Sequence, residues 1–214
     1  MKRTFDRIAR FDEQSRAYPI RAMVTGKPVV SRLWDCNTWL DQGSEGACTG
    51  FAVSHEACAD PAPIPDITNE TARAIYHEAK KHDQWDGEAY EGSSVLGAMK
   101  AAVLQGWYIE YRWAFSERDI ALAVAYSGPV VMGTDWHEGM SKPDVNGIIS
   151  MTGEMLGGHA YLIRGIDVAT GMYRIRNSWN KDWGLDGDCF VKRDVIAKLM
   201  SNFGEACVPT VRCT

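Results

Sequence analysis

Two residues that are far apart in the chain have the side chains needed for thiol catalysis. Cys48 ends the loop "DQGSEGAC" and precedes an apolar, helix-compatible run, and His159 opens the apolar segment "GGHAYLIRGID". A thiol at a helix N-terminus is stabilised as thiolate by unpaired N–H groups and the helix dipole. An imidazole can take the thiol proton and remain as imidazolium. The pair therefore predicts nucleophilic attack by sulfur on a carbonyl carbon.

Two amide side chains can support this chemistry. Asn177, in "IRNSWNKDWG", can accept a hydrogen bond from the imidazole and hold it in the useful tautomer, with Trp179 and Trp183 shielding that bond from water. Gln42 can donate to a developing oxyanion together with the backbone N–H of Cys48. The order along the chain is Gln, Cys, His, Asn.

The other histidines fit the role of base less well. His55 lies seven residues after Cys48 on the same predicted helix, so it cannot easily face the thiol. In "HEAKKH", His77 and His82 lack the i, i+4 pairing that a zinc-binding helix uses. His137, in a loop, remains a minor candidate. We expect neither a metal nor another cofactor.

Composition limits the classes of partner. The chain has 214 residues and a net charge of −5, without a Lys/Arg run, which argues against nucleic acid. No apolar run reaches the roughly 18 residues that a membrane span needs. The charged N-terminus has no apolar signal-peptide core, so we expect a cytoplasmic protein, in the host cytoplasm if it is virus-encoded.

The cysteines fit a reducing compartment. Six cysteines in 214 residues are too few for a disulfide-dense scaffold, and without an export signal we interpret the chain as mostly reduced. A Cys207–Cys213 pair stays open, because the two are close in sequence.

The elements change character along the chain. Helical patterns cover 49–58, 68–81, 94–106 and 116–128, with a polar loop over 82–94 between the second and third. Short apolar runs follow in "PVVMGTDW", "HAYLIRGID", "MYRIRNSW" and "CFVKR", as in an antiparallel sheet. This order predicts an α+β fold. We divide it into an N-terminal lead-in over 1–33, extended and partly wrapped on the surface, a helical lobe over 34–112 and a β-rich lobe over 113–214. A site is expected at the seam between the lobes.

Three motifs together resemble the papain family of cysteine peptidases: "QGSEGAC" with Phe51–Ala52, then "GGHA", then "NSWNKDWG". The resemblance implies a two-lobe fold, with a helical lobe and an antiparallel β-barrel-like lobe on either side of the cleft. It makes Cys48 the nucleophile, His159 the base and later acid, Asn177 the orienting residue and Gln42 the oxyanion donor.

The resemblance also implies the substrate site. It assigns Gly92 and Ser93 to pairing with substrate backbone. The residues that it assigns to the rest of the substrate site are Met132, Gly133, Gly157, Gly158, Ala160 and Trp179.

This chain departs from the family pattern in several places. Glu45 stands where many animal and plant members have a disulfide-bonded cysteine, and Thr49 stands where an aromatic is common. Gly158 replaces an acid found in many members. Both the Cys–His and the Cys–Asn spacings are shorter than usual, and the lead-in is far shorter than an inhibitory pro-segment. These features resemble divergent bacterial and viral members.

The sequence thus predicts a peptidase that acts on peptides or proteins through a thioester. Two alternatives stay open. One is a different enzyme on the same scaffold, either an amidase that trims cell-wall peptides or an acyl transferase. The other is a catalytically silent peptide-binding protein with its N-terminal stretch in the cleft. The oligomeric state is left open.

Overall fold

The structure is a computed structural model that describes residues 3–83 and 91–212. Most of the predicted loop over 82–94 and Cys213 lie outside the described residues. The elements are, in chain order, α1 (Glu13–Arg16), α2 (Arg21–Val24), β1 (Arg32–Leu33), α3 (Cys48–Ala57), α4 (Asn69–His82), α5 (Val95–Leu104), β2 (Tyr108–Trp113), α6 (Glu117–Tyr126), β3 (Val130–His137), α7 (Glu138–Ser141), β4 (Met155–Asp167), β5 (Met172–Arg176), β6 (Asp188–Lys192), α8 (Arg193–Ser201) and β7 (Glu205–Arg212).

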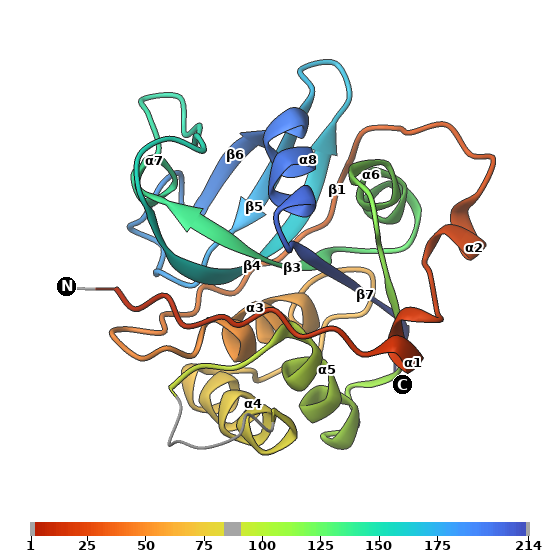
Figure 1. Cartoon of the computed structure of the whole chain (residues 1–214), viewed down its shortest axis with the longest axis vertical. Helices are drawn as coiled ribbons and strands as arrows, with labels where there is room; N and C mark the ends of the chain where they lie inside the picture. The colour runs from red at the N-terminus through yellow and green to blue at the C-terminus, as the bar shows by residue number, and fades with distance from the viewer. Residues whose placement is uncertain (1–2, 84–90, 213–214) are drawn as a thin grey trace.

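Helices α3, α4 and α5 pack together on one side of the molecule (Figure 1). Every residue of α3 is buried, which makes it the central helix of this group. Gly50 lets α4 approach closely, since a Cβ there would lie 2.7 Å from the backbone nitrogen of Tyr76. The Thr68 side chain caps α4 by accepting from the Thr71 N–H. The predicted helices are confirmed to within a few residues at each end.

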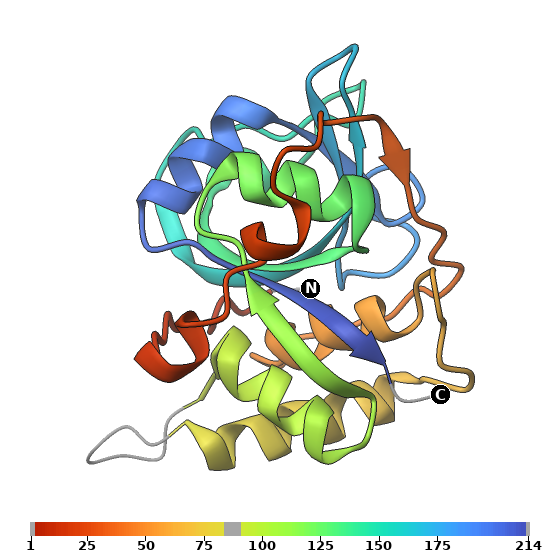
Figure 2. The ribbon, with the colours of Figure 1, turned by 90° about the vertical axis from the view of Figure 1, so that its right-hand side faces the viewer.

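The strands form one antiparallel sheet in the order β2-β7-β3-β4-β5-β6, with β1 paired to β4. The order ends at β2 and β6, so the sheet is open and the expected barrel-like lobe is not a closed barrel. Figure 2 shows β2 and β7 side by side at one end. Both were missed from the sequence, β7 in part because Pro209 argues against a strand. Proline is tolerated because, among the residues that the structure describes, this part of β7 pairs with β2 alone, whereas β3 pairs only with 205–207.

The sheet lies between two hydrophobic cores. Val131, Ala160 and Leu162 face the core of α3–α5, whereas their neighbours Met132, Tyr161 and Ile163 face the core that α6 and α8 cover (Figure 2). This is the period-two alternation of a strand that is buried on both faces. Helix α8 was also missed from the sequence.

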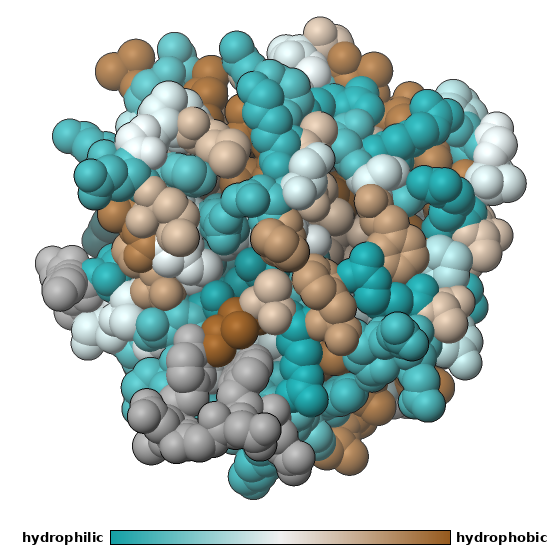
Figure 3. All heavy atoms as spheres, in the orientation of Figure 1, coloured by the Kyte–Doolittle hydropathy of each residue, from teal (hydrophilic) through white to brown (hydrophobic). Residues whose placement is uncertain are grey.

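The N-terminal segment, which we define as residues 3–10, runs between helices α3–α5 and the sheet before α1 begins (Figure 1). The Arg7 N–H donates to the Gly158 carbonyl at 2.9 Å, and the Ile8 N–H donates to the Ser93 carbonyl at 3.0 Å. The Ser93 N–H donates back to Asp6. The lead-in therefore does not only wrap the surface, as expected from sequence, but also lies between the lobes. In the space-filling view of this face, hydrophilic and hydrophobic residues are interspersed (Figure 3).

Candidate active site

Cys48 is the first residue of α3 and is fully buried. Its thiol lies at the backbone of Ala160, the residue after His159, because α3 packs against β4. Burial raises the pKa of Cys48 to about 11, a hydrogen bond to the Ala160 backbone opposes the shift, and the negative charge of Asp6 adds to it. With the segment in place, the thiol is therefore protonated at neutral pH.

His159 and Asn177 are joined by a hydrogen bond of 2.9 Å between the imidazole Nε2 and the amide Oδ1. Neighbouring strands bring them together, since His159 is on β4 and Asn177 directly follows β5. The Nδ1 atom of His159 is buried and has no hydrogen-bond partner among the described residues. The Asn177 amide therefore occupies one ring nitrogen of His159, and the other ring nitrogen is available to exchange a proton.

Aromatic rings surround the imidazole. The ring centroid of Trp136 lies 4.7 Å from that of His159, the centroid of Trp179 lies 5.1 Å away, and that of Phe5 lies 5.8 Å away. Burial lowers the pKa of His159 to about 4, although the Asn177 hydrogen bond acts in the opposite direction. The sequence predicts Trp179 and Trp183 as shielding residues but does not point to Trp136.

Gln42 is buried beside the loop that carries Asn177. Its Oε1 accepts from the Ser178 hydroxyl at 2.6 Å, and its Nε2 donates to the Glu45 carbonyl at 2.9 Å. The Gln42 N–H also donates to the Ser178 carbonyl at 3.0 Å. A primary amide has two N–H groups, so one remains for an oxyanion after Glu45 takes the other. Ser178, which fixes the amide orientation, was not singled out from sequence.

A buried ionic cluster supports the end of β5. Asp188 forms salt bridges with Arg164 at 2.5 Å, Arg174 at 2.6 Å and Arg176 at 2.5 Å. Arg176 also donates to the Thr38 carbonyl at 2.7 Å, which ties this strand to the loop before Gln42. Because Asn177 directly follows Arg176, the cluster also fixes the backbone position of Asn177. Burial would raise the pKa of Asp188, but hydrogen bonds from Arg164 and Arg176 outweigh it and lower the pKa.

The residues assigned to substrate binding surround the N-terminal segment, with Met132 and Ala160 as exceptions. Gly158 and Ser93 pair with its backbone, and a Cβ on Gly92 would clash with the Asp6 carbonyl. Trp179 packs against Phe5 at a centroid distance of 5.9 Å. A Cβ on Gly157 would lie 2.6 Å from the Phe5 carbonyl oxygen. Met132 instead packs in the core beneath α6 and α8, and Ala160 packs in the core of α3–α5 with Cys48.

Arg7 and Glu205 form a buried ion pair next to these residues. The Arg7 Nη2 lies 2.7 Å from Glu205 Oε2, and its Nε lies 3.0 Å from the same oxygen. The side chains are 2% and 0% exposed. Neither residue was predicted as part of the site, although an acidic residue at the start of the apolar run "EACV" was a usable signal.

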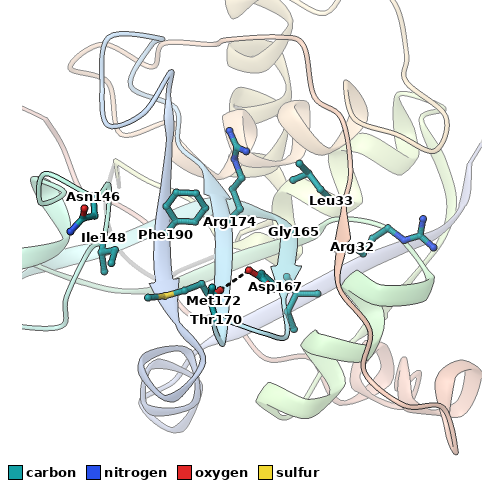
Figure 4. Close-up of a pocket in the computed structure, with 11 residues that line it drawn as sticks. Arg32, Leu33, Asn146, Ile148, Gly165, Asp167, Thr170, Met172, Arg174 and Phe190 are labelled. Atoms are coloured by element: carbon teal, nitrogen blue, oxygen red, sulfur yellow. Dashed lines mark hydrogen bonds between the residues drawn. The ribbon is translucent and has the colours of Figure 1, made fainter.

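A separate cavity of about 400 Å³ lies at strands β1, β4, β5 and β6 (Figure 4). Arg32 and Leu33 line it from β1, and Arg174 and Phe190 line it from β5 and β6. None of the residues assigned to catalysis or substrate binding lines this cavity. Within the described ranges, no helix is long and apolar enough to cross a membrane, and no group of three His, Cys, Asp or Glu side chains is placed to hold a metal ion.

Comparison with known proteins identifies the class. The family model described as papain family cysteine protease matches residues 30–204, which is most of the chain. The chain therefore belongs to the papain family of cysteine proteases.

Individual relatives agree with this assignment. A cathepsin B-like cysteine proteinase of Schistosoma japonicum is 31% identical over 96 residues, which are 40% of this chain and 28% of that protein. Xylellain, a cysteine protease from Xylella fastidiosa, has a similar fold with a TM-score of 0.73 at 19% identity, and the match covers 99% of each chain. Procathepsin L2 from the larval midgut of Tenebrio molitor gives a TM-score of 0.63 at 18% identity, with 97% of this chain and 78% of that chain covered. The α+β papain-like fold expected from the sequence is confirmed.

Proposed function

We propose that this chain hydrolyses peptide bonds with Cys48 as nucleophile and His159 as general base and acid. The observation that carries the proposal is the His159–Asn177 hydrogen bond. It leaves His159 Nδ1 without a partner in the described part of the chain, while the Cys48 thiol lies at the adjacent residue of β4. An oriented imidazole and a thiol at a helix start are the two components that thiol acylation requires.

In the first half of the reaction, His159 takes the thiol proton and the Cys48 sulfur attacks the substrate carbonyl carbon. The carbonyl oxygen becomes an oxyanion that accepts from the Cys48 backbone N–H, a donor left free at the helix start, and from the second amide N–H of Gln42. When the intermediate collapses, the C–N bond breaks and His159 gives its proton to the departing amine. A thioester remains on Cys48.

In the second half, His159 takes a proton from water, and the resulting hydroxide adds to the thioester carbonyl. Collapse of this intermediate breaks the C–S bond, and the acid product leaves. The proton returns to the Cys48 sulfur through His159. Asn177 accepts from Nε2–H throughout, so the same ring nitrogen faces the reacting atoms in both halves.

The N-terminal segment must leave the cleft before a substrate can enter. While the segment is in place, Cys48 and His159 are both fully buried, which disfavours their charged forms. Its departure admits water to the site, and the thiolate–imidazolium pair then becomes accessible near neutral pH. The form described here is thus a closed state of the proposed enzyme.

The test compares Cys48→Ala with Cys58→Ala, a matched loss of a buried thiol from the other end of the same helix region. Hydrolysis of a peptide mixture should disappear in Cys48→Ala and persist in Cys58→Ala, while both variants keep the wild-type circular dichroism spectrum. Retention of hydrolysis by Cys48→Ala would remove the proposal. Mass spectrometry with added amines also distinguishes hydrolysis from acyl transfer, because a transferase yields the amide of the added amine.

We also propose that the protein works in a reducing compartment, the cytoplasm, on peptide or protein substrates. Cys36, Cys48, Cys58, Cys189 and Cys207 are all free and buried, and a nucleophilic thiol persists longest where thiols are kept reduced. Fractionation of the producing cell followed by detection of the chain tests the location.

A further inference from the structure

A row of four residues, one from each of four neighbouring strands, forms the wall of the separate cavity (Figure 4). Leu33 of β1 lies opposite Gly165 of β4, Gly165 lies opposite Arg174 of β5, and Arg174 lies opposite Phe190 of β6. Residues that lie opposite one another in a sheet share a face. A Cβ on Gly165 would lie 2.8 Å from Leu33 Cδ1 and 3.5 Å from Arg174 Cβ, so the missing side chain leaves a hollow in the row.

The rest of the wall is largely apolar. Ile148 and Met172 line the cavity together with Leu33 and Phe190. The volume of about 400 Å³ is in the range of sites that hold small organic molecules. An apolar lining with a few polar groups is also typical of such sites.

The loop that follows α7 closes the cavity beyond β6. The Phe190 N–H donates to the Gly147 carbonyl at 2.7 Å, and the Ile149 N–H donates to the Phe190 carbonyl at 2.9 Å. Both backbone groups of Phe190 are therefore used, and an extended peptide cannot add to the sheet at this point. The cavity thus suits a compact molecule better than a polypeptide strand.

Arg174 brings a positive charge to this wall that Asp188 does not require. Asp188 is already paired with Arg164 and Arg176, whose side chains are 7% and 3% exposed. Arg174 adds a third guanidinium to the same carboxylate, through its Nε at 2.6 Å, and its side chain is 31% exposed. Neither Nη1 nor Nη2 of Arg174 has a hydrogen-bond partner among the described residues. These two nitrogens form a fork that can bind a carboxylate through two parallel hydrogen bonds.

The other charged residues of the cavity leave this guanidinium uncompensated. Asp167 accepts from the Thr170 hydroxyl at 2.8 Å, and Figure 4 shows it at the opposite end of the cavity from the Arg174 guanidinium. The guanidinium of Arg32 points away from the cavity in the same view, and it lies 5.1 Å from the ring centroid of Trp34. The charge that an occupant meets beside the apolar wall is therefore that of Arg174.

We propose that this cavity binds a small organic acid, with its carboxylate on the Nη groups of Arg174 and a compact apolar body against Phe190 and Leu33. The positive charge selects an anion, and the lining selects an apolar body. A nucleotide or a sugar phosphate would bring more negative charge than one guanidinium can pair and too little apolar surface for the wall. Neither Cys48 nor His159 takes part, so this inference does not rest on the proposed function.

The first experiment needs no variant. The full chain, labelled with ¹⁵N, is titrated with octanoate, 1-octanol and octylammonium, which share an eight-carbon chain and differ in the charge of the head group. We expect the backbone amides of Gly165, Thr170 and Phe190 to shift in the NMR spectrum. The Kd for octanoate should be at least about fivefold lower than for the other two ligands. Equal affinities, the absence of a saturable shift, or shifts confined to other parts of the chain would overturn the proposal.

Variants then locate the two halves of the ligand. Arg174→Gln should raise the Kd for octanoate about fivefold and leave that for octanol within about twofold. Asp188 keeps two partners in this variant, so the fold should persist, and circular dichroism checks it. Phe190→Ala should weaken octanoate and octanol by the same factor, because both lose the same apolar contact.

Arg32→Gln is the matched control, since it removes an arginine from the rim of the same cavity. It should leave the Kd for octanoate within about twofold, because a guanidinium that points away from the cavity makes no direct hydrogen bond to the ligand. If the Kd for octanoate is unchanged in Arg174→Gln, or rises as much in Arg32→Gln, the carboxylate does not lie on Arg174 and the proposed site is wrong.

Discussion

Asp188 and Glu205 are two buried carboxylates that differ in where their cations come from. Asp188 is surrounded by Arg164, Arg174 and Arg176, all supplied by β4 and β5. Glu205 is paired with Arg7, which belongs to a segment outside the matched family region. The pKa of Asp188 is lowered, whereas burial raises the pKa of Glu205 to about 7.

The difference separates a structural charge from one that is available to a ligand. A carboxylate with permanent partners in its own sheet is neutralised in every state of the folded chain, so its role is to stabilise the fold. A carboxylate whose cationic partner belongs to a displaceable segment loses that positive charge when the segment moves. The following predictions test this contrast, from the largest effect to the smallest.

Asp188→Asn should cause the largest loss of stability. It leaves three arginines around a neutral amide, and breaking a buried ion pair on one side typically costs about 3–5 kcal/mol. Urea unfolding at pH 7 measures the change. Glu205→Gln, the matched substitution, should change the free energy of unfolding by less than half as much, because Arg7 can move into solvent. Equal losses in the two variants would contradict the contrast.

Arg7→Ala should open the cleft. Without its guanidinium the segment loses its buried anchor, so Cys48 should react with iodoacetamide at pH 7 at least ten times faster than in wild type. Site-mapped mass spectrometry gives the rate. In wild type, where the thiol pKa is about 11, the rate should climb roughly tenfold per pH unit between pH 7 and 10. A wild-type rate that is already flat across this range would show that the thiol is not held protonated.

The two carboxylates should respond to pH with opposite signs. The lowered pKa of Asp188 gives stability that is present above its ordinary value of 3.8 and is lost as the pH falls through the folded-state value. The raised pKa of Glu205 makes the folded state bind more protons between pH 4.5 and about 7, so stability is lost as the pH rises through this window. Each carboxyl group changes the free energy of unfolding by at most about 1.4 kcal/mol per pH unit.

Urea titrations across pH test this by difference. The free energy of unfolding of wild type minus that of Glu205→Gln should fall from pH 4.5 to 7. The free energy of unfolding of wild type minus that of Asp188→Asn should rise as the pH increases from 2 to 4. Slopes of the same sign would refute the assignment of the two roles.

Arg3→Ala should have the smallest effect and serves as a control for Arg7→Ala, since both remove an arginine from the same segment. Arg3 pairs with Asp41 at 2.6 Å, but the two side chains are 22% and 29% exposed. Such pairs contribute about 0.2–1 kcal/mol. Alkylation of Cys48 should therefore accelerate no more than about fivefold. If Arg3→Ala accelerated the alkylation of Cys48 more than Arg7→Ala does, Arg3 would be the residue that holds the N-terminal segment in the cleft.

The sequence predicted the elements that carry Cys48, His159 and Asn177 better than it predicted which segment fills the cleft. Helix starts and strand ends are local features, so the positions of Cys48, His159 and Asn177 followed from caps, glycines and apolar runs. The partners of Arg7 and Asp188 depend on long-range packing, and nothing local marks an arginine as buried. The strand β7 was missed for a related reason, because the tolerance of Pro209 depends on which neighbour its edge has.

The N-terminal segment is covalently part of the chain whose cleft it fills, and this has a consequence for how it competes. A tethered ligand faces its site at a fixed effective concentration, which for short flexible connections is in the millimolar range. Diluting the protein therefore does not release the segment, and a free peptide must match that local concentration to displace it. If the N-terminal segment leaves the cleft only briefly and rarely, this step limits turnover at low substrate concentration, whatever the rate of the chemical steps.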